Sequence, residues 1–417
     1  MSKLLIKGGK ELCGETEIKA AKNAVLPILA ATLLTEEKCE LLHVPHIADI
    51  SNMLKILQTL GSEVSFEKGV ITLDNRDVSR HNVPNELAKE LRSSFFLLGP
   101  ILGRMRRAVV AYPGGCDIGV RPLDIHIKGL REMGIAVEES HGMIYCDGSR
   151  LKGADLLLDF PSVGATENLM MVAALAKGRT RISNAAKEPE VVDLQDFINA
   201  MGGKVRGAGS SVIEVEGVSK LHGCTYTPIP DRIVAGTILI AGAVCGGEVT
   251  VRGAVREHLE PLLFKLNKSS CFIRCQGDKI TVIRRDALRN LDKLETQPYP
   301  GFPTDLQSQI MVMMSVSEGT GVIVENIFET RFRIVRELMK MGAEITVKDR
   351  TAVIRGVRSL EGAAVSARDL RGGAALVIAG ARAEGYTTIE NVEHIDRGYE
   401  SIETLFTALG AEVKRLQ

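Results

Sequence analysis

The chain has 417 residues, a length that favours two domains of ordinary size. Lys and Arg together number 52, as do Asp and Glu, so the formal net charge is zero, and the lack of a basic excess argues against a general nucleic-acid-binding protein. Hydrophobic residues make up 45% of the sequence, which is enough for large cores.

The N-terminus and the cysteines predict a reduced, cytoplasmic protein. Residues 1–5 lack the apolar stretch of a signal peptide. The uncharged run 233–247 is too short and too rich in glycine to cross a bilayer, so we expect no membrane insertion. The eight cysteines show no CxxC spacing, which favours free thiols. His43 and His46 are interpreted as incidental rather than as ligands, and we expect no metal.

One sequence motif recurs along the chain. It is Leu-x-x-hydrophobic-Gly or a close variant, at the end of a predicted helix that is followed by a short strand. A glycine at this position is typical of the left-handed residue that closes a helix. The copies with glycine are 57–61, 130–134, 198–202, 338–342 and 406–410. A sixth copy, 266–270, carries Ser270 in place of the glycine.

The spacing of these copies indicates a duplication. Gly134 and Gly342 lie 208 positions apart, and Gly202 and Gly410 show the same separation. Between the copies runs a second repeated element, a helix so apolar that it must be buried on most faces, followed by a strand. Its copies are 22–42, 93–111, 168–184, 233–251, 308–326 and 374–391.

The two elements together predict an α/β fold with helices inside and sheets outside, a two-domain inside-out α/β barrel built from six βαβαββ-like repeats. We expect residues 22–229 to form one three-repeat domain, and residues 1–21 with 230–417 to form the other. Two linkers between the domains would make a hinge, with the cleft between them as the ligand and active site.

The stretch 112–122 predicts a mobile surface loop, because five of its residues are proline or glycine. Cys116 stands in this loop, five residues before Arg121. A nearby guanidinium favours the thiolate, the reactive form of cysteine. The alternative is that Cys116 is merely a small apolar residue. Asp117 follows it directly, and a carboxylate there disfavours the thiolate that Arg121 favours.

Charged or capping residues stand where the predicted buried helices begin, and helix N-termini attract anions. The starts are 22–23, 92–94, 162–166, 231–232, 303–305 and 369–371. Simple capping is the competing interpretation for Asp231, Asp305 and Asp369, each cap contributing about 1 kcal/mol. If the six starts converge on one cleft, they suit a phosphorylated substrate and a carboxylate base.

Several motifs carry a resemblance to a known family. They are 22–23, 113–116, 121–122, 161–168, 230–232, 300–305, 327–332 and 394–399. On these motifs the chain resembles the family of UDP-N-acetylglucosamine enolpyruvyl transferases from about residue 3 to the C-terminus, including the inside-out barrel fold.

The resemblance implies transfer of enolpyruvyl from phosphoenolpyruvate to the 3′-hydroxyl of UDP-N-acetylglucosamine, with release of phosphate, as the first committed step of peptidoglycan synthesis. It implies addition followed by elimination, without a metal or an organic cofactor, and sensitivity to fosfomycin. Protonation of the substrate methylene carbon requires an acid, the attacking hydroxyl requires a base, and the charged intermediate requires an anion clamp.

The resemblance also assigns residues to roles. Catalysis falls to Cys116 as the acid, Asp305 as the base, and Lys22 and Arg397. The phosphoenolpyruvate-binding set is Lys22, Asn23, Arg121, Arg331, Arg371 and Arg397. The UDP-N-acetylglucosamine-binding set is Arg92, Arg121, Pro122, Leu123, Asp124, Ile125, Ser162, Val163, Gly164, Asp305 and Ile327.

Two alternatives stay open. The related transferase that acts on shikimate 3-phosphate shares the barrel but has no need of the Cys116 loop. The second alternative belongs to a different functional class, a non-catalytic paralogue that binds or regulates. The presence of Lys22, Cys116, Asp305 and Arg397 argues against it.

Overall fold

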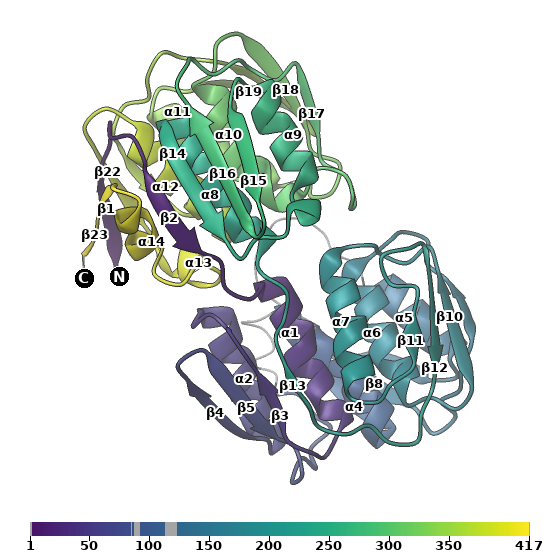
Figure 1. Ribbon diagram of the computed structural model, residues 1–417. Helices are drawn as coiled ribbons and strands as arrows, with labels where there is room; N and C mark the ends of the chain where they lie inside the picture. The colour runs from purple at the N-terminus through teal and green to yellow at the C-terminus, as the bar shows by residue number, and fades with distance from the viewer. Residues whose placement is uncertain (1, 85, 87–91, 113–122, 417) are drawn as a thin grey trace. The chain divides into compact units, whose positions relative to one another are not determined.

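The computed structural model describes residues 2–84, 86, 92–112 and 123–416 (Figure 1). These residues form two compact units. Unit 1 comprises residues 2–19 and 230–416, and unit 2 comprises the described residues of 20–229. Each unit has a hydrophobic core of its own.

The described part of unit 2 has three sheets, and in each the neighbouring strands are hydrogen-bonded in the following order. The first is β13 (Thr225–Tyr226), β3 (Cys39–Leu41), β5 (Val70–Asp74) and β4 (Glu63–Glu67). The second is β6 (Arg107–Ala111), β8 (Met143–Asp147) and β7 (Ala136–Ser140). The third is β11 (Val205–Arg206), β12 (Val212–Glu216), β10 (Arg179–Ser183) and β9 (Asp155–Leu157).

Two kinds of helix lie between these sheets. The most buried ones are α1 (Lys22–Ala31), α4 (Leu98–Met105) and α6 (Val163–Ala174). Every residue of α1 from Ala24 onward is buried, and the same holds for α6 from Ala165 onward. The helices with one exposed face are α2 (Ala48–Leu60), α5 (Asp124–Glu132) and α7 (Pro189–Ala200).

Unit 1 repeats this plan with three four-stranded sheets. The first is β15 (Phe272–Gln276), β16 (Lys279–Arg284), β14 (Gly247–Arg252) and β2 (Gly14–Glu17). The second is β17 (Lys293–Glu295), β18 (Thr320–Val324), β20 (Thr351–Arg355) and β19 (Glu344–Lys348). The third is β21 (Ala364–Ser366), β22 (Tyr386–Glu390), β1 (Lys3–Lys7) and β23 (Glu412–Leu416).

The inner helices of unit 1 are α8 (Arg232–Cys245), α10 (Gln307–Ser315) and α12 (Leu370–Arg382), and they pack against one another. The other described α-helices of unit 1 are α9 (Glu260–Lys268), α11 (Val335–Lys340), α13 (Glu393–Asp396) and α14 (Ile402–Ala408). The strand β1 pairs antiparallel with β23, so the two ends of the chain lie side by side (Figure 1).

Each four-stranded sheet follows one connection rule. The strand after an inner helix pairs parallel with a short strand and antiparallel with a longer one, as β10 does with β9 and β12. Since the inner helices are buried and the sheets lie around them, the predicted inside-out α/β fold with six repeats is confirmed.

The repeat glycines close helices as predicted. Gly134, Gly202, Gly342 and Gly410 have φ of 84°, 89°, 90° and 94°. Ser270, at the equivalent place after α9, adopts φ of 70°. A side chain in this region crowds the following carbonyl, so the serine keeps a conformation that glycine adopts more readily.

We predict that Ser270→Gly stabilises unit 1 by roughly 0.5–1 kcal/mol, because the left-handed backbone no longer crowds a Cβ atom. The matched control is Gly342→Ser, whose added Cβ meets no atom within 4 Å and so tests the backbone cost alone. It should destabilise by a similar amount. Urea unfolding of both variants measures the two changes, and equal stability of Ser270→Gly and wild type would contradict the strain.

Candidate functional site

The inner helices of unit 1 carry acidic residues where they begin. Asp231 accepts hydrogen bonds from two backbone N–H groups of the first turn of α8, at 2.8 and 2.9 Å. Asp369 does the same for α12, at 3.0 and 2.9 Å. The capping interpretation is therefore confirmed for these two aspartates.

Asp305 has a different environment. It lies in the 3₁₀ helix Thr304–Leu306 that leads into α10. Its Oδ1 pairs with Arg331 Nη2 at 2.5 Å, and its Oδ2 pairs with Arg371 Nη2 at 3.3 Å. The side chains of the two arginines are 2% and 4% exposed, whereas that of Asp305 is 26% exposed. The carboxylate is thus anchored by two buried guanidinium groups and is itself partly exposed.

Arg331 is held by a polar frame at the end of β18. Its Nε donates to the carbonyl oxygen of Thr304 at 3.2 Å, and its guanidinium carbon lies 5.5 Å from the centre of the Phe328 ring. The Thr304 hydroxyl donates to Glu325 at 2.9 Å. Glu325 in turn accepts from the backbone N–H groups of Ile327 and Phe328 at 2.9 and 3.0 Å. One buried carboxylate therefore fixes Thr304, Ile327 and the Arg331 environment together.

A chain of hydrogen bonds that reaches the inner helices α8 and α10 holds Arg371. Its Nη1 donates to the Tyr399 hydroxyl at 3.5 Å, and that hydroxyl shares a 2.8 Å hydrogen bond with Thr237. Gln309 donates to Thr237 at 3.0 Å and extends the chain to α10. Burial alone would lower the pKa of Arg371, but attraction to Asp305 and Tyr399 raises it above its ordinary value. Arg371 therefore remains a cation throughout the working range of pH.

In unit 2 the first turn of α1 carries Lys22 and Asn23, both partly buried. Lys22 Nζ pairs with Asp49 Oδ2 at 3.0 Å, with side-chain exposures of 13% and 3%. Asp49 lies in the first turn of α2. The nearly buried carboxylate holds the ammonium at the start of α1, where the helix N-terminus adds positive potential.

The starts of α5 and α6 hold further residues of the predicted site. The Ser162 hydroxyl caps α6 and accepts from Ala165 N at 3.4 Å. A Cβ atom on Gly164 would lie 3.3 Å from His126 Nε2, so the glycine allows α6 to approach the buried His126 on α5. Val163 is the first residue of α6, and Leu123, Asp124 and Ile125 lie at the start of α5.

Some predicted site residues cannot be placed with these. Cys116, Arg121 and Pro122 lie outside the described residues, as does the side chain of Arg92. Arg397 follows α13 directly and is partly buried in unit 1. The structure therefore brings together Asp305, Arg331 and Arg371, with Ile327 beside them.

Sequence reasoning missed the supporting residues, namely Asp49, Glu325, Tyr399 and Thr237. Glu325 and Tyr399 did have a signal, since one follows β18 directly and the other ends the 394–399 motif. Asp49 and Thr237 had none, because their partners lie far away in the sequence.

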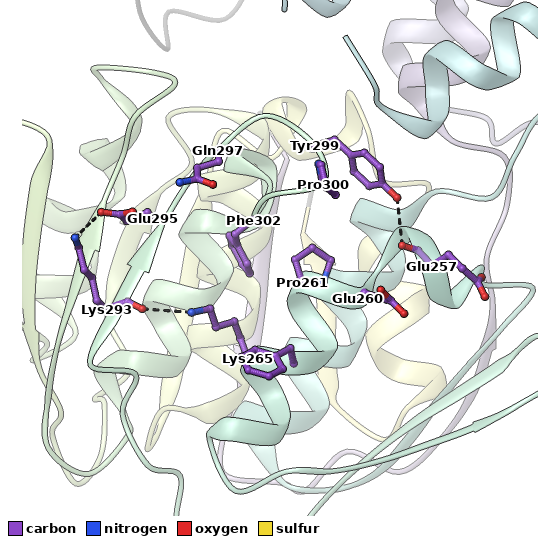
Figure 2. A pocket seen from close by; sticks show the side chains of 11 residues that line it. Glu257, Glu260, Pro261, Lys265, Lys293, Glu295, Gln297, Tyr299, Pro300 and Phe302 are labelled. Carbon is purple, nitrogen blue, oxygen red and sulfur yellow. Dashed lines mark hydrogen bonds and ion pairs between the residues drawn. The ribbon is translucent and has the colours of Figure 1, made fainter. Parts of the chain in front are cut away.

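An open hollow of about 520 Å³ lies elsewhere on unit 1 (Figure 2). None of the predicted site residues lines it. Lys293 pairs with Glu295 at 2.5 Å, and Lys265 donates to the Lys293 carbonyl oxygen at 3.3 Å. Tyr299 donates to the Glu257 carbonyl oxygen at 3.3 Å. Because these polar groups bond to one another, we take the Asp305 cluster rather than this hollow as the candidate site.

Within the ranges described above, no group of three or more His, Cys, Asp or Glu side chains is arranged to hold a metal ion. No helix in the same ranges has the length and apolar character needed to cross a membrane.

Three comparisons bear on this geometry. The family model described as EPSP synthase (3-phosphoshikimate 1-carboxyvinyltransferase) matches residues 6–406. The chain is 51% identical over 416 residues to UDP-N-acetylglucosamine 1-carboxyvinyltransferase 2 of Caldanaerobacter subterraneus subsp. tengcongensis, with 100% of both chains covered. It is 48% identical to UDP-N-acetylglucosamine 1-carboxyvinyltransferase 1 of Carboxydothermus hydrogenoformans, covering 100% of this chain and 99% of that protein.

Among solved structures, the crystal structure of the enolpyruvyl transferase NikO from Streptomyces tendae matches with a TM-score of 0.90. The match covers 99% of this chain and 98% of that one at 21% sequence identity. At this identity the likeness bears on the fold alone.

One further buried group stands out near the start of α6. Glu167 is 0% exposed, and neither of its carboxyl oxygens has a hydrogen-bond partner among the described residues. Burial raises its pKa well above the ordinary value, and the nearby Glu190 and Glu188 raise it further. Burial therefore favours the protonated form of Glu167 in the folded protein.

We predict that Glu167→Gln stabilises the protein increasingly as pH rises. The unfolded carboxyl group ionises above about pH 4.5, while the folded group keeps its proton, so wild-type stability falls with rising pH and the amide variant is spared this loss. Urea unfolding between pH 5 and 8 measures the difference. Glu138→Gln, at an exposed position of β7, is the control, and a pH-independent difference for Glu167→Gln would contradict the buried neutral acid.

Proposed function

Because the chain belongs to the enolpyruvyl transferase family, we propose that it transfers the enolpyruvyl group of phosphoenolpyruvate to the 3′-hydroxyl of UDP-N-acetylglucosamine, releasing phosphate. The observation that carries this proposal is the identity of about half of all residues, over the full length, with transferases of that specificity. The product of this reaction is used in peptidoglycan synthesis. The chain is thus a UDP-N-acetylglucosamine 1-carboxyvinyltransferase in activity.

The reaction divides into an addition and an elimination. In the addition, a proton goes to C3 of phosphoenolpyruvate, positive charge develops at C2, and the sugar oxygen forms a bond to C2 as its hydroxyl proton leaves. In the elimination, the bond between C2 and the phosphate oxygen breaks, and C3 returns a proton to restore the double bond. The protein must supply an acid, a base and stabilisation of charge.

We assign the base to Asp305. Its partly exposed carboxylate can accept the proton of the 3′-hydroxyl, while Arg331 and Arg371 fix its orientation from the buried side. The two guanidinium groups also offset the negative charge of an incoming phosphate or carboxylate. We place both arginines among the phosphoenolpyruvate-binding groups, together with Arg397.

We assign the remaining anion contacts of phosphoenolpyruvate to Lys22, Asn23 and Arg121, and the proton donor to Cys116. The ion pair of Lys22 with Asp49 supports its assignment, because it holds a cation at the start of α1. The proposed set draws on both units, which we equate with the three-repeat domains 22–229 and 1–21 with 230–417.

The nucleotide sugar is assigned to residues at the starts of helices. Ser162 caps α6, and Val163 and Gly164 are its first residues; all three are partly exposed, and a helix N-terminus suits a phosphate. We add to them Arg92, residues 121–125 and Ile327. The Glu325 frame supports the choice of Ile327, because it orients the Ile327 backbone beside Asp305.

The related activity on shikimate 3-phosphate is disfavoured. The family model covers both reactions, but the relatives at 48–51% identity are named for the nucleotide sugar. We expect phosphate release from phosphoenolpyruvate to depend on UDP-N-acetylglucosamine and to be absent with shikimate 3-phosphate. Release with the second acceptor alone, or with neither, would overturn the proposed function. In this assay Asp305→Asn should lower the rate by about 10²–10⁴-fold.

The matched control for Asp305→Asn is Glu403→Gln. Glu403 is also a carboxylate of unit 1 paired with an arginine, Arg415, at 2.9 Å, and its side chain is 20% exposed. Loss of such a pair should affect stability slightly and turnover little. Equal turnover of both variants would place the base elsewhere.

A separate prediction concerns Cys116. If its role is to deliver a proton to C3, Cys116→Asp should retain turnover, whereas Cys116→Ser should lose at least about 100-fold, because a hydroxyl is a far weaker acid. An epoxide that mimics phosphoenolpyruvate, such as fosfomycin, should alkylate the wild type at Cys116 and leave Cys116→Asp active. Intact-mass analysis and peptide mapping check both points, and an adduct on another cysteine with Cys116 unmodified would contradict the assignment.

A further inference from the structure

Two cysteines that are far apart in the sequence lie on neighbouring strands of unit 2. β13 pairs in parallel with β3, with Thr225 opposite Glu40 and Tyr226 opposite Leu41. One step earlier the same register places Cys224 opposite Cys39, and the N–H of Glu40 donates to the Cys224 carbonyl oxygen at 2.9 Å.

The distance between the two backbones suits a covalent bond. Neighbouring strands lie about 4.8 Å apart, and a disulfide accepts Cα separations of about 4.4–6.8 Å. Side chains at paired positions point to the same face of a sheet. In this structure both cysteines are free thiols.

The two thiols are not equivalent. Cys39 is fully buried, whereas Cys224 is partly exposed. The neighbouring Cys39 thiol lowers the pKa of Cys224, and the nearby His222 lowers it further against the opposing effect of burial. The Cys224 thiol and burial raise the pKa of Cys39. The accessible thiol is therefore the better nucleophile, and the buried thiol stands beside it.

We propose that Cys224 and Cys39 form a reversible disulfide when the protein meets a hydroperoxide. This inference is independent of the proposed transferase activity, because it uses none of the residues assigned to that reaction. Cys146 and Cys245 differ from Cys224, since burial raises the pKa of each to about 12.

The chemistry proceeds in two steps. The Cys224 thiolate attacks one peroxide oxygen, the O–O bond breaks, and hydroxide leaves to take up a proton as water, which gives a sulfenic acid. The Cys39 sulfur then attacks the Cys224 sulfur, the S–O bond breaks, and the hydroxyl leaves with the Cys39 proton as a second water. The two sulfurs together lose two electrons, and the peroxide gains them. A thiol reductant reverses the bond by exchange.

The bond would tie the ends of unit 2 together. It would link β3, near the start of the unit, to β13, which is a two-residue edge strand close to its end. A cross-link that closes so long a loop restricts the unfolded chain strongly. We expect the oxidised protein to melt roughly 5–10 °C higher than the reduced protein.

The test treats the full-length protein with hydrogen peroxide, blocks the remaining thiols, and digests it with trypsin without reduction. Cleavage after Lys38, Lys55, Lys220 and Arg232 gives peptides 39–55 and 221–232, each with a single cysteine. We expect these two peptides joined, at a mass two hydrogens below their sum, and released by dithiothreitol.

Variants make the result specific. Cys224→Ser and Cys39→Ser should each abolish the linked peptide and the rise in melting temperature, while Cys245→Ser on α8 should preserve both. Cys224→Ser is the safer of the first two, because its position is partly exposed and the variant should fold. Disulfides between other cysteines, or sulfinic acid at Cys224 with Cys39 still a free thiol, would overturn the proposal.

Discussion

A helix that is buried on almost every face can offer polar groups only at its ends. This constraint applies to α1 and α6 in unit 2 and to α8, α10 and α12 in unit 1, whose buried residues are mostly small or aliphatic. The unpaired backbone N–H groups of their first turns must find acceptors. Polar chemistry therefore collects where these helices begin, and the candidate site is a consequence of the way the barrel is packed.

The packing also explains why the charges in unit 1 are held so rigidly. Arg331 and Arg371 are almost completely buried, and such cations are stable only when each is paired and hydrogen-bonded. Asp305 pairs with both, Glu325 organises the surroundings of Arg331, and Tyr399 bonds Arg371. Electrostatic groups fixed in this way need little reorganisation when a charged ligand binds, which is the arrangement that favours catalysis by charge stabilisation.

Much of the fold could be predicted because its signals are local. A glycine in the left-handed conformation ends the helix of a repeat. The 208-residue separation of Gly134 and Gly342 therefore predicted a duplication. The candidate site was harder to predict from the sequence. Each of the three aspartates could be a cap from sequence alone, and only the structure separates Asp231 and Asp369, which cap helices, from Asp305, which pairs with two arginines. The partners of Lys22 and Arg371 depend on contacts between repeats, which no local pattern encodes.

The two units show what a duplication keeps and what it changes. Each has a capped inner helix in its last repeat, where Ser162 begins α6 and Asp369 begins α12. In its middle repeat each has a 3₁₀ turn that leads into an inner helix, Arg92–Leu97 before α4 and Thr304–Leu306 before α10. The two units thus share the same backbone arrangement at these helix starts, while the side chains there differ. The cap is neutral in unit 2 and anionic in unit 1. An anionic cap offsets the positive potential of the α12 N-terminus, whereas a neutral cap leaves the positive potential of the α6 N-terminus available to a phosphate. Selection on the two copies could therefore specialise one unit for a carboxylate framed by buried arginines and the other for anion binding, without altering the fold that the repeats share.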